Sequence, residues 1–176
     1  MAPFTNRPLL IAALILLSSC THHPRLAPFR SDGCSLFPDK DYLRGQSWCS
    51  CCVVHDVAYW QGGSDSERLA ADDSLRTCVA GRTGDSALAY TIWNGVRTGG
   101  SGAMPTWYRW GYGWPYWAEA VPDSVRYRQV RERGGADVAG EAMRECGEGP
   151  EGLRRPENPP LRRALAHDRP GRDRRR

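Results

Sequence analysis

The amino-acid sequence predicts a mainly helical domain that is exported from the cell and cross-linked by disulfides. Helical segments with start and stop signals fill residues 47–97, and no segment alternates convincingly between apolar and polar residues, as a half-buried strand would. An apolar leader precedes these segments. Six of the seven cysteines follow the leader and Cys20, and an even number of cysteines in a small exported domain indicates disulfide bonds.

Residues 1–19 are typical of a bacterial signal peptide. Arg7 precedes an apolar run at residues 8–17, which is shorter than the roughly 20 residues of a membrane-spanning helix. The run leads into Leu17-Ser18-Ser19-Cys20, which resembles a lipobox, the signal for cleavage before a lipid-modified cysteine. We therefore expect lipid on Cys20; ordinary cleavage near this residue, without lipid, is the alternative.

Lipid on Cys20 would place the protein in the cell envelope. Each buried CH₂ of an acyl chain contributes about 0.8 kcal/mol, so several chains on one residue hold a protein firmly. The residue after Cys20 is Thr21. An Asp at this position would favour placement in the inner membrane. We therefore expect a lipid-anchored protein at the outer membrane that faces the periplasm or the exterior.

The positive charge of the chain is concentrated at its C-terminal end. The net charge is +4, and residues 148–176 hold nine Arg against five acidic residues, so the rest is nearly neutral. The charge therefore gives no reason to expect a nucleic-acid partner. Residues 148–176 have little to bury and are expected to form a disordered tail. Residues 20–31 look like a tether, which leaves residues 32–147 for the domain.

The segments of the domain follow in order from a loop at residues 32–46. A first helix is predicted from about residue 47 to residue 61, where Gly62-Gly63 ends it. Ser64 and Glu67 have the spacing of a capping box, which predicts the start of a second helix.

The second helix is predicted to end near Ala80, because glycines follow at positions 81 and 84. A third helix, capped by Asp85 or Ser86, is predicted to run to about Arg97. Residues 123–146 have room for a further helix.

Seven Trp and Tyr residues crowd the segment 107–117, which also contains glycine. Because Trp and Tyr favour the bilayer interface, this segment is a candidate for contact with a phospholipid membrane surface or for the lining of an acyl-chain pocket. The alternative is that these rings fill the core over the helices.

The first predicted helix carries two ionisable residues on a surface that is otherwise largely apolar. His55 shares one side of this helix with Tyr59, and Asp56 projects about 100° away from His55. A helix that is apolar nearly all round is buried, and an unpaired charge within it is very costly. The pair therefore needs partners.

Asp72 is the candidate partner of His55. It points towards the apolar side of the second predicted helix, whereas Asp73 points away from it. If disulfides clamp the two helices together, Asp72 meets His55 and holds the imidazole in one tautomer, which gives a dyad able to activate water. The alternative is a structural hydrogen bond in the core.

The residues Cys51-Cys52-Val53-Val54-His55-Asp56-Val57-Ala58-Tyr59 resemble the phospholipase A2 signature C-C-x-x-H-D-x-x-Y. The similarity covers roughly residues 32–80, because Asp72 stands six residues before Cys78, as the corresponding residues do in that family. The resemblance implies a phospholipase A2-like fold, with two long disulfide-linked antiparallel helices, a calcium-loop-like segment and additional helices.

The resemblance also implies roles for the site residues. His55 would be the general base, and Tyr59 would hydrogen-bond Asp72, which in turn holds His55. Asp56 would bind calcium (Ca²⁺). By position from Cys34, the other calcium ligands would be the carbonyls of Gly33, Ser35 and Phe37, with Asp39 or Asp32 as possible substitutes, because the Gly-rich loop of the animal enzymes is absent.

The disulfides that the resemblance implies are Cys51–Cys78 and Cys34–Cys52, which leave Cys49 and Cys146 to pair with each other. The activity that it implies is calcium-dependent hydrolysis of the sn-2 ester of glycerophospholipids. One alternative is a non-catalytic envelope lipoprotein that keeps the fold for binding or structure. Another is a thiol or zinc protein that uses Cys49, Cys51, Cys52 and His55.

Overall fold

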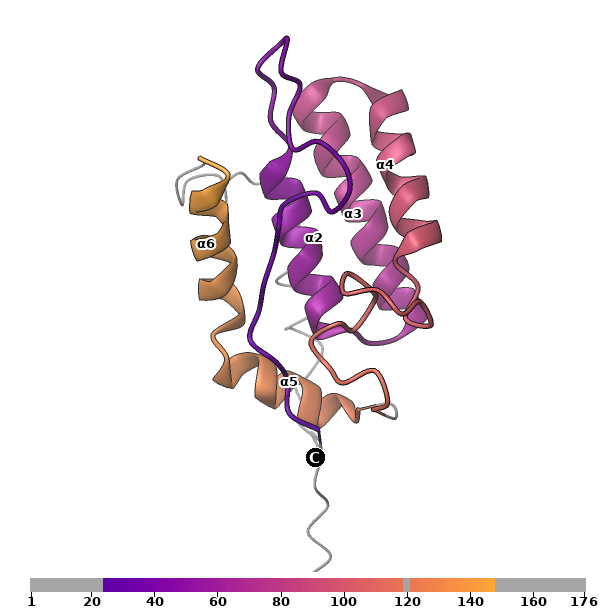
Figure 1. Cartoon of the computed structure of the whole chain (residues 1–176), viewed down its shortest axis with the longest axis vertical. Helices are drawn as coiled ribbons and strands as arrows, with labels where there is room; N and C mark the ends of the chain where they lie inside the picture. The colour runs from indigo at the N-terminus through magenta and orange to yellow at the C-terminus, as the bar shows by residue number, and fades with distance from the viewer. Residues whose placement is uncertain (1–23, 119–120, 148–176) are drawn as a thin grey trace, which may run out of the picture.

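The computed structural model describes residues 24–118 and 121–147, and these residues form a mainly helical domain without extended strands (Figure 1). The only β-type pairing in these ranges is an isolated antiparallel bridge between Lys40 and Ser47. The helices are α2 (Cys49–Gln61), α3 (Asp65–Thr83), α4 (Ser86–Gly99), α5 (Asp123–Glu132) and α6 (Gly135–Glu145). None of the described helices is long and apolar enough to cross a membrane.

Helices α2 and α3 form an antiparallel pair joined by a tight turn. Gly62 ends α2 with a positive φ of 65°, and a Cβ there would lie 2.8 Å from the backbone of Gly111, so this turn requires glycine. Ser64 caps α3 in a capping box with Glu67, as the sequence predicts.

Helix α3 runs to Thr83, so the predicted end near Ala80 is wrong. Gly81 lies inside the helix, and a single interior glycine costs only about 1 kcal/mol. The helix ends at Gly84, which adopts the left-handed conformation with φ 69°. Helix α4 begins after Asp85, whose side chain accepts a hydrogen bond from the Leu88 N–H, and packs beside α3.

The segment 123–146 forms two helices instead of one. Gly134 adopts a left-handed conformation with φ 68°, which breaks the segment into α5 and α6. Helix α6 then turns back along α2 on the side away from α3 and α4 (Figure 1).

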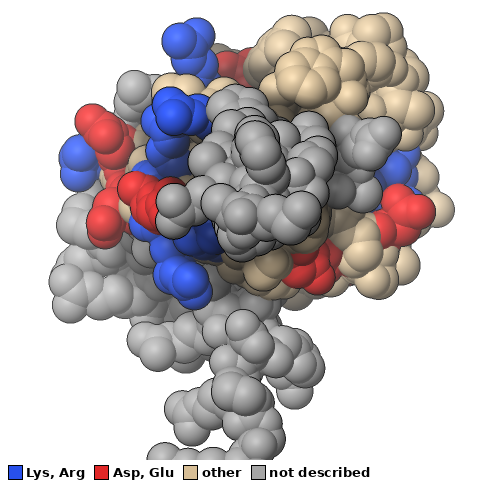
Figure 2. All heavy atoms as spheres, turned by 90° about the horizontal axis from the view of Figure 1, so that it is seen from below, with Lys and Arg blue, Asp and Glu red and all other residues tan. Residues whose placement is uncertain are grey.

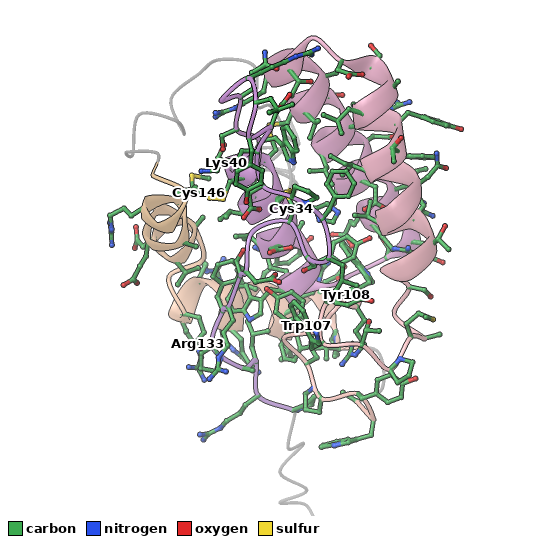
Figure 3. The ribbon with its side chains drawn as sticks, turned by 45° about the horizontal axis from the view of Figure 1, so that its top comes forward. Cys34, Lys40, Trp107, Tyr108, Arg133 and Cys146 are labelled. Atoms are coloured by element: carbon green, nitrogen blue, oxygen red, sulfur yellow. A yellow bond between two sulfur atoms is a disulfide. The ribbon has the colours of Figure 1, made fainter. Side chains whose placement is uncertain are left out.

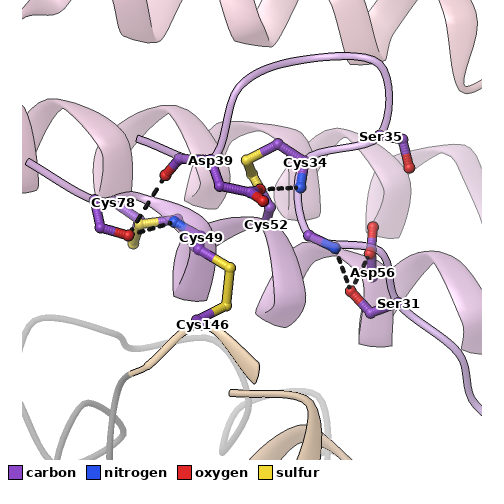
Figure 4. Close-up of a disulfide and its surroundings, with 12 residues drawn as sticks. Ser31, Cys34, Ser35, Asp39, Cys49, Cys52, Asp56, Cys78 and Cys146 are labelled. Atoms are coloured by element: carbon purple, nitrogen blue, oxygen red, sulfur yellow. Dashed lines mark hydrogen bonds between the residues drawn. A yellow bond between two sulfur atoms is a disulfide. The ribbon is translucent and has the colours of Figure 1, made fainter. Parts of the chain in front are cut away.

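Three disulfides fasten the elements together, and they are the three pairs expected from the sequence. Cys51–Cys78 joins α2 to α3, Cys34–Cys52 joins the preceding loop to α2, and Cys49–Cys146 joins the end of α6 to the start of α2 (Figure 4). On the chain-entropy model, each of the first two stabilises the fold by about 3 kcal/mol.

Residues 24–31 belong to the packed domain, which corrects their assignment to a tether. Leu26 is fully buried in a cluster with Trp60, Trp114 and Val130. The Trp60 indole donates to the Ala27 carbonyl at 2.8 Å. The signal peptide at residues 1–19, the lipidation site Cys20 and the tail at residues 148–176 lie outside the described residues.

Candidate active site

His55 and Asp72 meet in the interior between α2 and α3. The His55 Nε2 lies 2.8 Å from the Asp72 Oδ1, and both side chains are buried, with Asp72 wholly inaccessible to solvent. The short link between the antiparallel helices and the Cys51–Cys78 bond bring these residues together although 17 positions separate them. The apolar sides of the two helices predicted this meeting, on the condition that a disulfide clamps the helices together.

Asp72 is held as a charged carboxylate. Burial opposes its ionisation, but hydrogen bonds from His55, Arg97 and Tyr59 keep its pKa below the usual value. A charged carboxylate accepts hydrogen bonds, so the Nε2 of His55 carries the proton that it donates to Asp72. No hydrogen bond from a described residue reaches the other ring nitrogen, Nδ1, which is therefore available to accept a proton.

Tyr59 completes the expected network around Asp72. Its hydroxyl donates to the Asp72 Oδ1 at 2.8 Å, and its ring packs on the His55 ring with centroids 4.2 Å apart. Burial and the nearby Asp72 raise the pKa of Tyr59, while the hydrogen bond from Arg68 opposes that rise. Tyr59 is therefore a neutral hydroxyl that can donate to Asp72.

Two arginines that the sequence analysis did not single out also approach Asp72. The Arg97 Nη1 donates to the Asp72 Oδ2 at 2.7 Å, and the Arg68 Nε lies 4.0 Å from the same oxygen. Arg68 stands one helical turn before Asp72, so its i, i+4 spacing was a usable signal. Arg97 comes from α4, and its approach depends on helix packing that leaves no periodic pattern in the sequence.

Asp56 points towards Ser31 and the loop around Cys34 (Figure 4). Its Oδ2 accepts a 2.6 Å hydrogen bond from the Ser31 hydroxyl, which itself accepts from the Gly33 N–H. Burial raises the pKa of Asp56 to about 8, against the Ser31 hydrogen bond and with added repulsion from Asp32 and Asp39. A carboxylate in such surroundings is a strong candidate to bind a cation.

The loop beside Asp56 offers oxygen ligands. Gly33, Ser35 and Phe37 all line the same pocket as Asp56, and their backbone carbonyls accept no hydrogen bond from a described residue. The two acidic residues suggested as substitute ligands hold the loop itself. Asp39 accepts from the Cys34 N–H at 2.7 Å, and Asp32 accepts from the Ser35 hydroxyl at 2.9 Å.

This donor set fits calcium. Calcium takes six to eight oxygens, which one carboxylate, backbone carbonyls and waters can supply. Among the described residues, no group of three or more His, Cys, Asp or Glu side chains is placed to hold a metal ion. The six described cysteines are all in disulfides, so the thiol and zinc alternative has no thiolate to use within these residues.

A pocket of about 340 Å³ connects the two parts of the site. Its lining includes His55, Asp56, Tyr59, the loop 33–37, one face of α4 and Tyr108. Figure 3 shows the loop at Cys34 and the segment at Trp107 and Tyr108 on the same side of the helix bundle. Most of the lining is apolar, which suits an acyl chain.

The aromatic segment 107–117 divides into a buried and an exposed part, so the filling of the core accounts for some of its rings and not for others. Trp110 and Trp114 are buried and donate through their indole N–H groups to the carbonyls of Gly63 and Gln61 at the end of α2. Exposed rings are Trp107, Tyr116 and Trp117. The segment lies at the lower right of Figure 1, and the view from below shows uncharged side chains massed on that side (Figure 2).

Comparison with protein-family models, with curated proteins and with solved structures finds no match to this chain. The chemistry of the site therefore rests on its own residues and geometry.

Proposed function

We propose that the protein is a calcium-dependent hydrolase of the phospholipase A2 type, which cleaves the sn-2 ester of glycerophospholipids. One observation carries the proposal: His55, which is paired with the buried Asp72, and the candidate calcium ligand Asp56 line the same largely apolar pocket. The antiparallel α2 and α3, their disulfide and the loop before them support a phospholipase A2-like fold.

The residues around the pocket suit general-base hydrolysis. The free Nδ1 of His55 takes a proton from water, whose oxygen bonds to the ester carbonyl carbon. As the bond from that carbon to the glycerol oxygen breaks, His55 returns the proton to the departing oxygen. Asp72 and Tyr59 hold the imidazole throughout, and the products are a fatty acid and a lysophospholipid.

Asp56 and the loop carbonyls would hold calcium, and its positive charge would polarise the ester carbonyl and attract the phosphate. A backbone N–H near Ser35 is a further candidate to hold the developing oxyanion. The apolar face of α4 accommodates an acyl chain.

The proposed partner is a phospholipid membrane surface. The exposed Trp107, Tyr116 and Trp117 lie in the segment that also supplies Tyr108 to the pocket, so rings suited to the bilayer interface are near the pocket in the chain. A lipid on Cys20 would keep the protein at the cell envelope, where such a surface is present.

The test uses the full chain, oxidised so that its three disulfides form, and phosphatidylcholine vesicles with a labelled sn-2 acyl chain. We expect release of labelled fatty acid with calcium and none with a chelator. His55→Gln and Asp56→Asn should both abolish release. Asp73→Asn is the matched control, because Asp73 adjoins Asp72 but is about half exposed. Calcium-independent release, or none from the unmutated chain, would reject the proposal.

A second candidate is a non-catalytic lipoprotein that binds calcium or lipid. The two guanidinium groups near Asp72 favour it, because a carboxylate already paired with arginine stabilises an imidazolium less strongly. Calorimetric calcium binding that Asp56→Asn abolishes, without any ester hydrolysis, would support this second function.

A further inference from the structure

We propose that Arg97 is a positioning residue, which fixes the Asp72 carboxylate so that one oxygen always faces His55 and Tyr59. Its effect on turnover rests on the proposed hydrolase function, whereas its effect on the imidazole does not. Arg97 would act entirely through Asp72.

The two oxygens of Asp72 have separate partners. Oδ1 accepts from the His55 Nε2 and from the Tyr59 hydroxyl, each at 2.8 Å. Oδ2 accepts from the Arg97 Nη1 at 2.7 Å. A carboxylate group can rotate about its last bond, and a short charge-assisted hydrogen bond to one oxygen restricts that rotation. Arg97 thereby determines the direction of the other oxygen.

Arg68 has a different role from Arg97, although it is also near Asp72. Its Nη2 donates to the backbone carbonyls of Val96 and Arg97 at 3.1 and 2.7 Å, and its Nε donates to the Tyr59 hydroxyl at 3.3 Å. These bonds fasten the C-terminal turn of α4 to α3. Arg68 therefore places the helix end from which the Arg97 side chain reaches Asp72.

Arg97 does not line the pocket, although Val96 and Gly99 on the same helix do. Its side chain remains 30% exposed while Asp72 is fully buried, so Arg97 approaches the carboxylate from the solvent edge of the network. A substitution at Arg97 should therefore change the orientation of Asp72 and His55 while leaving the substrate contacts in the pocket intact.

The experiment compares the full, oxidised chain with Arg97→Gln, Arg97→Lys and Arg76→Gln. Arg76 is the matched control, because it pairs with the neighbouring Asp73 at 3.5 Å in an exposed ion pair. The first measurement is the tautomer of His55 from the ¹⁵N chemical shifts of its ring at a fixed pH, with His55→Gln to assign the signals. The second is kcat and KM for vesicle hydrolysis.

We expect His55 in the unmutated chain to carry its proton on Nε2. Arg97→Gln should give a mixture of tautomers and lower kcat by about tenfold to a hundredfold with KM unchanged, as a misplaced catalytic group does. Arg97→Lys, which keeps the charge, should leave His55 mainly in the Nε2 tautomer and retain most of the kcat. Arg76→Gln should change neither the tautomer nor kcat.

If His55 in Arg97→Gln has the same tautomer as in the unmutated chain, and kcat is also the same, the proposal is overturned. If that variant does not fold, a His55 proton on Nδ1 in the unmutated chain would overturn it, and the Nε2 tautomer retained in Arg97→Lys would support it. An unmutated chain that cleaves no ester would reject the hydrolase function alone, since the tautomer still tests Arg97.

Discussion

Ser31 and Asp56 are joined by a 2.6 Å hydrogen bond between the Ser31 hydroxyl and the Asp56 Oδ2 (Figure 4). Ser31 precedes the loop 33–37, and Asp56 lies in the middle of α2. The Ser31 hydroxyl also accepts from the Gly33 N–H at 3.2 Å. Ser31 therefore links the carboxylate to the loop whose carbonyls would complete a calcium site.

Ser31→Ala should weaken calcium binding. The substitution leaves Asp56 and the loop carbonyls in place but removes the group that orients them, and such losses typically reduce metal affinity tenfold to a hundredfold. Isothermal titration with calcium measures the change. Ser74→Ala is the control, because the hydroxyl of the partly exposed Ser74 donates to the Ala70 carbonyl of its own helix. Equal calcium affinity in the two variants would show that the Ser31 bond has no part in the site.

Asp72→Asn should destabilise the fold far more than Asp73→Asn. The first change removes a buried charge that pairs with Arg97 and lies close to Arg68, and breaking a buried pair typically costs about 3–5 kcal/mol. Because Arg97 is partly exposed, the lower end of this range is expected. Asp73 is about half exposed, so its substitution should fall within about 0.5 kcal/mol of zero. Urea denaturation of the oxidised protein gives both values.

Glu67 should make the stability of the fold sensitive to acid. Burial tends to raise the pKa of Glu67, but hydrogen bonds from Ser64 and Arg126 outweigh burial and lower it. A carboxyl group with a lowered pKa in the folded state stabilises the fold above its unfolded pKa, and this contribution is lost as pH falls through the folded pKa.

Glu67→Gln should therefore reduce stability at neutral pH by about 1–3 kcal/mol, because it weakens both the α3 cap and the pairing of the buried Arg126. The difference in unfolding free energy between Glu67→Gln and the unmutated chain should shrink as the solution is acidified. Thermal unfolding at a series of pH values measures it. Glu132→Gln is the control, since Glu132 is exposed and lies 4.0 Å from Arg128. A constant difference across the pH range would contradict the role given to the Glu67 charge.

Trp107→Ser and Trp117→Ser should reduce binding to phospholipid vesicles. Both rings are mostly exposed, and moving a large apolar side chain out of water contributes more than 1 kcal/mol, so each loss should weaken binding by about tenfold. Hydrolysis of a dissolved short-chain phospholipid should be unchanged. Tyr90→Ser is the control, because Tyr90 is exposed on α4 outside this segment. Vesicle sedimentation separates the outcomes, and equal losses in all three variants would contradict a specific membrane surface.

Local sequence signals predicted much of the helical fold. The capping box of Ser64 and Glu67, the Asp85 cap and the glycines at positions 62 and 84 have their effects within one helical turn, so they are visible in the sequence. Gly81 misled the prediction because the packing of α3 compensates for the small cost of one interior glycine. Leu26 was missed because two adjacent apolar residues between prolines show no periodicity, although the burial of Leu26 fixes residues 24–31 on the domain.

The sequence by itself determined which side chains α2 and α3 direct inwards, because helical periodicity orients His55, Tyr59 and Asp72 wherever the helices lie. Only the tertiary structure decided what else reaches them. Arg97 approaches Asp72 from α4, and Ser31 approaches Asp56 from the segment before the loop. These contacts depend on how separate elements pack, and distant residues that meet in this way need share no spacing or motif along the chain.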